Sequence, residues 1–113
     1  MKPYCLIREA LSFFQPCWAA LLKEVPIENI THLFASHQDP DIISSLGLWD
    51  QALTKAKLHS PWFWEGFIRH FGMEKVDYAP IPDEGRSLNI SGIEIQFIPA
   101  HYVHSSGNFS VYD

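Results

Sequence analysis

One short polar stretch, SHQDPDI at residues 36–42, carries side chains that could bind a metal ion. It places His37, Asp39 and Asp41 at alternate positions directly after the apolar run NITHLFA. Alternate positions of an extended loop share one side, and Pro40 disfavours a helical conformation at Asp39. Imidazole and carboxylate together suit iron, manganese or zinc. Asp-Pro-Asp is also typical of a turn or a helix cap, so the residues alone leave both interpretations open.

A second group of candidate ligands lies near the end of the chain. His101 and His104 stand in PAHYVHSSGN, just after the apolar run IEIQFI. Functional sites gather at strand ends in α/β proteins, because the strands are rigid and the loops are free to carry chemistry. Neither loop contains a thiolate, which disfavours a closed structural zinc site. Taken alone, these two histidines are more often packed or surface residues.

Strands must hold both loops in place, and the pattern of apolar residues in the sequence predicts several strands. Residues 29–36 read as a strand with Ile30, His32 and Phe34 on one face and Leu33 on the other. Ser-Gly at positions 91 and 92 indicates a hairpin. Further extended segments are expected at residues 57–60, 75–82, 87–90, 93–100 and 109–112.

Helices are expected between these strands, which makes the predicted fold class α/β. Residues 16–25 have helical periodicity, and a further short helix is expected over residues 48–56. Asp41 is a plausible N-cap for a short helix that ends at Gly47. The segment SPWFWEGFIRHFG predicts a helix over residues 60–72, with Ser60 as cap and Pro61 in first position. Its aromatic side chains cover nearly all sides, which suggests deep packing, and core packing is the expected role of its tryptophans, Trp62 and Trp64.

Length and charge limit the functions that this chain can have. With 113 residues it suffices for one small domain. The formal net charge of -5 and the lack of a basic block argue against nucleic acid and against an anionic membrane surface as partners. No apolar run approaches the roughly 20 residues of a membrane-spanning helix. Arg8 and Glu9 interrupt any signal-peptide core, so a cytoplasmic location is expected.

The two loops together resemble a known superfamily. HLFASHQDPDI and IPAHYVHSSGNFSVYD are similar to the metallo-β-lactamase superfamily, in particular its flavodiiron branch and the related oxygen-binding di-iron proteins. SPWFWEGFIRHFG and IPDEG also look like that family, so the likeness covers residues 30–113. By this resemblance His37, Asp39 and His104 would bind a first iron, and Asp41 would serve a second.

The chain departs from the family pattern at three points. Asp39 stands where the flavodiiron branch usually has Glu, and Ile42 occupies the position of a ligating His. Because isoleucine cannot bind a metal, the second iron lacks one ligand. His101 would either bind the iron in its place or contact the residues that do. The family's bridging Asp and last His are absent because the chain ends first. The resemblance therefore implies a partial domain over residues 1–113, truncated at both ends and corresponding to roughly the first half of an αββα sandwich.

The resemblance implies a non-haem di-iron domain that binds or senses O2 or another small molecule. In the resembling proteins, reduction of O2 draws electrons from a flavodoxin-like FMN domain, and this chain shows no such domain and no Gly-rich phosphate loop. One alternative is a metal-dependent hydrolase of the same superfamily, with zinc in place of iron. Another is an inactive truncated remnant. A homodimer, or a partner chain that supplies the missing ligands, would complete the site.

Overall fold

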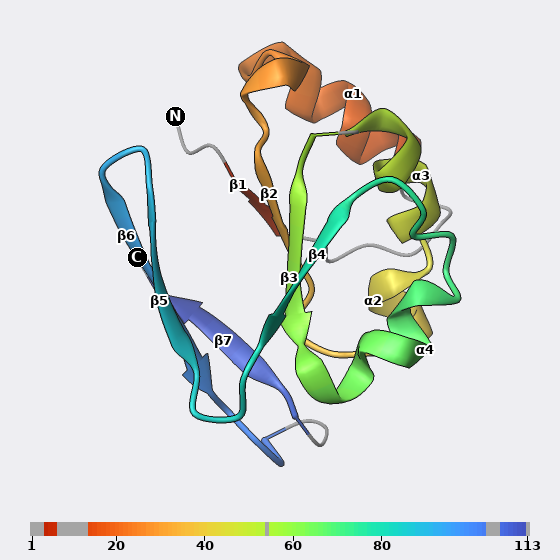
Figure 1. The fold of residues 1–113 in the computed structure, drawn as a ribbon. Coiled ribbons are helices and arrows are strands. Elements are labelled where there is room, and N and C mark those ends of the chain that lie inside the picture. Colours follow the sequence, from red (N-terminus) through yellow and green to blue (C-terminus); the bar gives the residue numbers. More distant parts are fainter. Residues whose placement is uncertain (1–3, 7–13, 54, 104–106, 113) are drawn as a thin grey trace.

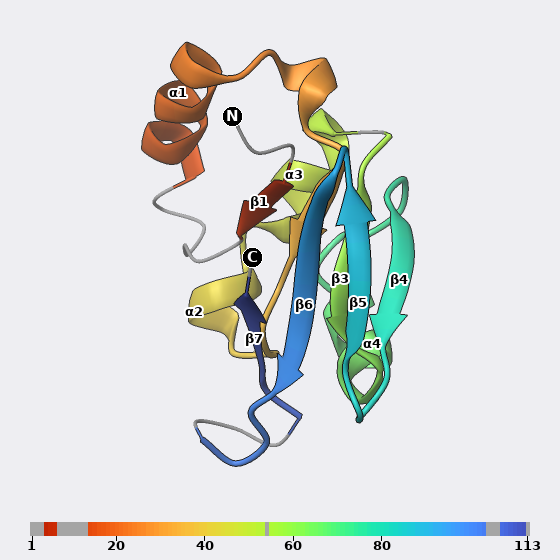
Figure 2. The same ribbon diagram turned by 90° about the vertical axis from the view of Figure 1, so that its left-hand side faces the viewer.

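The elements of this protein form three layers. A computed structural model describes residues 4–6, 14–53, 55–103 and 107–112. Helices cover one face of a four-stranded sheet, and a three-stranded sheet covers its other face (Figure 1). Turning the molecule by 90° shows the three-stranded sheet lying in front of the longer strands of the first sheet (Figure 2).

The first sheet is parallel throughout and carries the first candidate loop at the end of its second strand. Its strands follow one another in chain order and are β1 (Tyr4–Leu6), β2 (His32–Phe34), β3 (Lys57–Pro61) and β4 (Asp77–Ile81). Parallel neighbours need a crossover, and helical segments provide each one. These segments are α1 (Phe14–Glu24) and η2 (Ile27–Asn29), then α2 (Pro40–Ile43) and α3 (Leu46–Ala52), then η3 (Trp62–Trp64) and α4 (Glu65–Arg69).

The second sheet is antiparallel and carries the other candidate loop between its last two strands. It consists of β5 (Arg86–Ile90), β6 (Ile93–Pro99) and β7 (Phe109–Tyr112), in that order. Ser91 and Gly92 join the first two strands with φ angles of 51° and 87°. Two successive positive φ angles are those of a two-residue type I′ turn. The predicted hairpin is therefore confirmed.

Two apolar cores hold the layers together, and β2 contributes to both. Leu33 packs among buried residues of the helices and the first sheet, whereas Phe34 packs between the two sheets against Phe97. The predicted alternation of faces is confirmed at these positions. Ile30 belongs to the helix-side core, so its assignment to the face of Phe34 was wrong. It lies before the strand begins, at the end of η2, where the period of two does not apply.

Several element boundaries differ from the prediction. Ser60 and Pro61 belong to β3, where they pair with β4, and the helical segment starts only at Trp62 as a 3₁₀ turn. Ser60 does not cap a helix because its hydroxyl is hydrogen-bonded to the phenol of Tyr78. The short strand β1 was not predicted. Its three residues carry too little pattern to indicate a strand.

The aromatic segment after β3 is also more exposed than expected. Trp62 and Phe63 keep 49% and 56% of their surface accessible, and Phe67 keeps 42%. The prediction of deep packing on several sides was therefore wrong for these three residues, and so was core packing for Trp62. Trp64 does pack against the helix-side core. A stretch of only eight residues, split between 3₁₀ and α geometry, cannot turn every ring inward.

A polar chain of two histidines and one arginine crosses the space between the sheets. The guanidinium of Arg86 donates to Nδ1 of His59 over 2.8 Å, and Nε2 of His59 lies 2.9 Å from Nδ1 of His32. Because Nδ1 of His59 accepts, its Nε2 carries the proton and donates to His32. Burial, followed by the nearby charges of His32, Arg86 and Lys57, lowers the pKa of His59 from 6.5 to about 3.

This buried neutral histidine predicts acid-sensitive stability. The unfolded chain protonates His59 near its ordinary pKa, whereas the folded chain does so only near pH 3. The unfolded state thus binds more protons between these values, and the free energy of unfolding falls as the pH decreases from about 6.5, by roughly 3 kcal/mol at pH 4. Urea unfolding at several pH values measures the effect. His59→Gln keeps an acceptor for Arg86 without titrating, so its profile should be flatter, and equal slopes would contradict the assignment.

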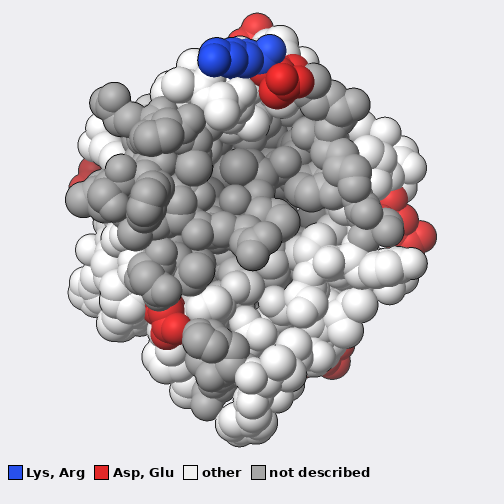
Figure 3. All heavy atoms as spheres, turned by 180° about the vertical axis from the view of Figure 1, so that it is seen from behind, with Lys and Arg blue, Asp and Glu red and all other residues white. Residues whose placement is uncertain are grey.

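On the rear face, the described residues show one group of basic atoms at the top edge with acidic side chains beside it, and the other acidic side chains are spread apart from one another (Figure 3). None of the described helices has the length and apolar character needed to cross a membrane.

Candidate metal centre

The loop after β2 starts from a firmly held position. The peptide N–H of Ala35 donates to the carbonyl oxygen of His59 on β3 over 2.9 Å, and Ala35 is fully buried. The carbonyl oxygen of Ser36 then accepts from the N–H of Phe109, the first residue of β7, over 3.1 Å. One hydrogen bond from each sheet therefore fixes the backbone immediately before His37.

His37 and Asp39 point toward a common position. Nε2 of His37 lies 3.5 Å from Oδ2 of Asp39, and His37 is buried whereas the carboxylate is about one-third exposed. On the other side of the ring, Nδ1 of His37 lies 2.6 Å from the hydroxyl oxygen of Ser36. A ring that donates from Nδ1 to this hydroxyl keeps the lone pair on Nε2, which is the tautomer that binds metals through Nε2.

The separation of these two atoms fits two ligands of one metal ion. Nitrogen and oxygen ligands that each lie about 2.0–2.2 Å from an ion, at angles between octahedral and tetrahedral, are roughly 3.0–3.5 Å apart. The same distance would also suit an ion pair between Asp39 and a protonated His37. Imidazole and carboxylate are donors for iron and for zinc, so the residues present fit the metal that the sequence suggests.

Asp41 does not continue the extended loop. Asp39 has extended backbone angles, with φ −61° and ψ 132°, and it is the N-cap of α2. Pro40 is the first residue of that helix, and Asp41 lies within it. The prediction that Asp41 caps the helix, and that it follows His37 and Asp39 by simple alternation, was therefore wrong. The side chain of Asp41 lies outside the described residues, so its role as a ligand stays a prediction.

The loop that contains His104 begins and ends beside the His37 loop. Residues 104–106 lie outside the described part of the chain. The base of the loop is closed by a hydrogen bond of 2.9 Å from the N–H of Ala100 to the carbonyl oxygen of Asn108. Since the next residue, Phe109, is bonded to Ser36, this base lies directly against the first loop. His104 as a third ligand of the same ion remains a prediction that this placement favours.

His101 is engaged elsewhere within the same loop. Its Nε2 donates to the backbone carbonyl oxygen of Asp83 over 2.9 Å, and its ring meets Phe109 edge-on. Among the described residues, no third His, Cys, Asp or Glu joins His37 and Asp39 in a group that could hold an ion. His101 therefore holds the turn after β4 against the loop, a contact that sequence spacing could not reveal.

The layered α/β fold with a His-carboxylate loop at the end of β2 has clear relatives. The family described as ODP family beta lactamase matches residues 9–113, which is nearly the whole chain, and the chain belongs to this family. The predicted superfamily is thereby confirmed. Among curated proteins, none matches the chain.

Solved structures of the same fold give the same assignment. A peroxy diiron species of the chemotaxis sensor ODP is 34% identical, with a TM-score of 0.81. The apo state of this sensor from T. denticola is also 34% identical, with a TM-score of 0.84. Both matches cover 97% of this chain, which spans 45% of the length of those sensor chains.

A more distant relative supports the fold alone. The flavodiiron protein from Giardia intestinalis is 20% identical, with a TM-score of 0.84, and the match covers 96% of this chain and 27% of that protein. The α/β metallo-β-lactamase-like architecture predicted from the sequence is therefore confirmed.

Proposed function

We propose that this chain provides the His-carboxylate part of a non-haem di-iron domain that binds or senses O2. The observation that carries the proposal is the pairing of His37 and Asp39 at 3.5 Å at the end of β2, in a chain of the ODP family. A related sensor is described as a peroxy diiron species, which identifies iron and oxygen chemistry in that relative.

Each residue of the site has a distinct role in this proposal. His37 and Asp39 bind the first iron together with His104, and Asp41 serves the second. Ferrous iron held by such donors would supply the O2-binding chemistry. Ser36 orients the imidazole of His37 through Nδ1, and its carbonyl oxygen fixes the second loop through Phe109.

The proposal includes partners for the second iron. Ile42 offers no ligand where the family has a His, so a second copy of the chain or another protein would complete that position. We infer that residues 1–113 act as part of a larger metallo-β-lactamase-like site in the cytoplasm.

Anaerobic loading with ferrous iron tests this function. The chain is expected to retain about one tightly bound ferrous ion, since only the first iron has its three protein ligands on this chain. Admission of O2 should produce a visible absorption band that is absent from the metal-free and zinc-loaded protein. Iron content by chemical analysis and the absorption spectrum are the measurements.

Three outcomes would contradict the proposal. Retention of zinc in preference to iron, with cleavage of an ester or phosphodiester, would indicate a hydrolase. Trace metal together with a cooperative thermal transition would indicate a folded chain that has no metal function. Trace metal without a cooperative transition would indicate an inactive remnant.

A further inference from the structure

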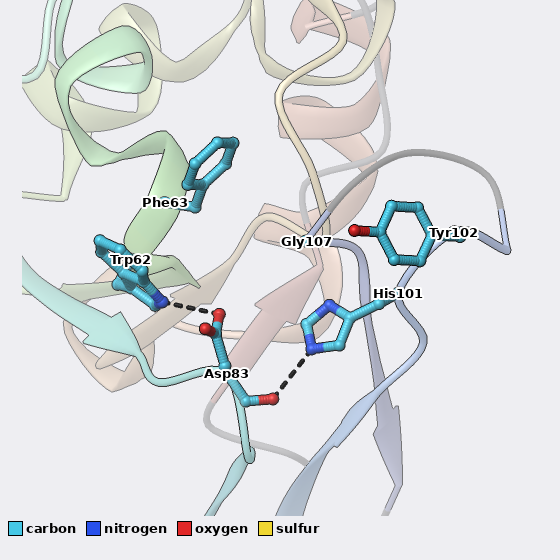
Figure 4. A pocket seen from close by; sticks show the side chains of 6 residues that line it. All are labelled: Trp62, Phe63, Asp83, His101, Tyr102 and Gly107. Atoms are coloured by element: carbon cyan, nitrogen blue, oxygen red, sulfur yellow. Dashed lines mark hydrogen bonds between the residues drawn. The ribbon is translucent and has the colours of Figure 1, made fainter.

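An open cavity of about 410 Å³ lies beside the loop after β6 (Figure 4). Its walls come from three separate segments, namely η3, the turn after β4 and the loop between β6 and β7. The residues that line it are Trp62, Phe63, Asp83, His101, Tyr102 and Gly107. None of them belongs to the His37 loop, while His101 and Gly107 lie on either side of His104 in the loop between β6 and β7.

The walls of the cavity are aromatic and exposed. Trp62, Phe63 and Tyr102 keep 49%, 56% and 83% of their surface accessible. The rings of Trp62 and Phe63 stand nearly at right angles, with centroids 5.9 Å apart. Figure 4 shows Tyr102 across the cavity from this corner. Exposed aromatic rings that converge on one space are typical of a binding site rather than of ordinary surface.

A carboxylate lies between these rings and is held in a fixed position. Nε1 of Trp62 donates to Oδ1 of Asp83 over 2.7 Å. Nε2 of His101 donates to the backbone oxygen of the same residue over 2.9 Å. Figure 4 shows the carboxylate between Trp62 and His101. Asp83 is exposed, and among the described residues only Trp62 donates to its carboxylate.

The backbone at Tyr102 supplies an independent sign of function. Its φ angle is 65°, in the left-handed region that a bulky aromatic residue rarely adopts. A hydrogen bond of 3.2 Å from the N–H of Val103 to the carbonyl oxygen of Ala100 closes the turn around it. Because the ring is largely exposed, this conformation gains little packing for the fold. Unfavourable backbone angles of this kind concentrate at ligand sites.

We propose that this cavity binds a small organic cation of the alkylammonium or quaternary ammonium class. Aromatic faces carry negative electrostatic potential and attract cations, with tryptophan the most effective. Asp83 provides the counter-charge, and an anion would be repelled by it. A hydrated metal ion would gain little from a single carboxylate surrounded by aromatic rings. The volume lies in the range of small-molecule sites.

Titration of the metal-free chain with choline tests the proposal without involving iron. The indole N–H resonance of Trp62, assigned by Trp62→Phe, should shift in a saturable way, and tetramethylammonium should act similarly. Added salt should weaken the binding because the carboxylate is exposed. The neutral analogue 3,3-dimethyl-1-butanol, which has the same shape as choline, should bind at least tenfold more weakly.

Variants separate the contributions of charge and ring. Asp83→Asn keeps an oxygen for the indole of Trp62 and removes the charge, so it should weaken choline binding at least tenfold. Tyr102→Phe should retain binding and Tyr102→Leu should reduce it severalfold. Tyr112 on β7 is also largely exposed, at 65%, and Tyr112→Leu is the matched control that should change nothing.

The proposal is overturned by any of three results. These are a Trp62 resonance that does not saturate with choline, equal binding of the neutral analogue, or unchanged affinity in Asp83→Asn. Since iron is absent throughout, failure here would leave the proposed iron site unaffected.

Discussion

His37→Ala is expected to abolish iron binding by this chain, with an affinity loss of more than about a hundredfold, because it removes the one imidazole paired with Asp39. Asp39→Asn should weaken iron binding less, since the amide oxygen can still coordinate but carries no charge. Both effects are measured by iron content after anaerobic loading and desalting.

A matched variant distinguishes ligand loss from general damage. His70 is an exposed histidine that follows α4, and His70→Ala should retain the iron of the original chain. Thermal unfolding of the metal-free proteins should be similar for the three variants. If His37→Ala keeps its iron while its fold is intact, the SHQDPDI loop is a turn and its assignment as a ligand loop fails.

The sequence predicted the residues of this loop better than their geometry. A buried strand followed by a His and two carboxylates was visible in the pattern, and His37 and Asp39 do converge. The alternation failed at Asp41 because Pro40 favours the first position of a helix as strongly as it disfavours helix before it. The same proline that keeps Asp39 extended is therefore also the first residue of α2.

The hairpin and the strands other than β1 were predictable because their signals are local. Ser91 and Gly92 can adopt the positive φ angles of a tight turn, and the apolar runs on both sides identify the strands. The sequence could not predict that Ser60 lies in β3 instead of capping a helix, since its hydrogen-bond partner Tyr78 is distant in the sequence. The same holds for His59, whose contact with His32 requires β2 to pair with β3 and whose contact with Arg86 requires the two sheets to stack.

Asp50 illustrates the same limit and gives the largest expected effect on stability. It lies in α3 and is 1% exposed. Its two carboxylate oxygens accept hydrogen bonds of 2.7–3.0 Å from the successive peptide N–H groups of Glu74, Lys75 and Val76. This single side chain thereby ties the helix layer to the segment that leads into β4. Nothing in the sequence pattern distinguishes it from a surface aspartate.

Asp50→Ala is expected to lower the free energy of unfolding by about 4 kcal/mol, because three peptide N–H groups lose a charged acceptor that is itself buried. Asp50→Asn should lose about half as much, since one amide oxygen still accepts while its NH2 group faces the peptide donors. Urea unfolding followed by tryptophan fluorescence measures both changes.

Asp77 supplies the control for these variants, because it is exposed and lies only one residue beyond the segment that Asp50 binds. Asp77→Ala should change stability by less than about 0.5 kcal/mol, as most surface substitutions do. A loss confined to Asp50 would show that the charged acceptor, rather than net charge, holds the segment before β4. Equal stabilities of Asp50→Ala and Asp77→Ala would contradict this role, because a buried carboxylate with these contacts cannot be removed without cost if they form in solution.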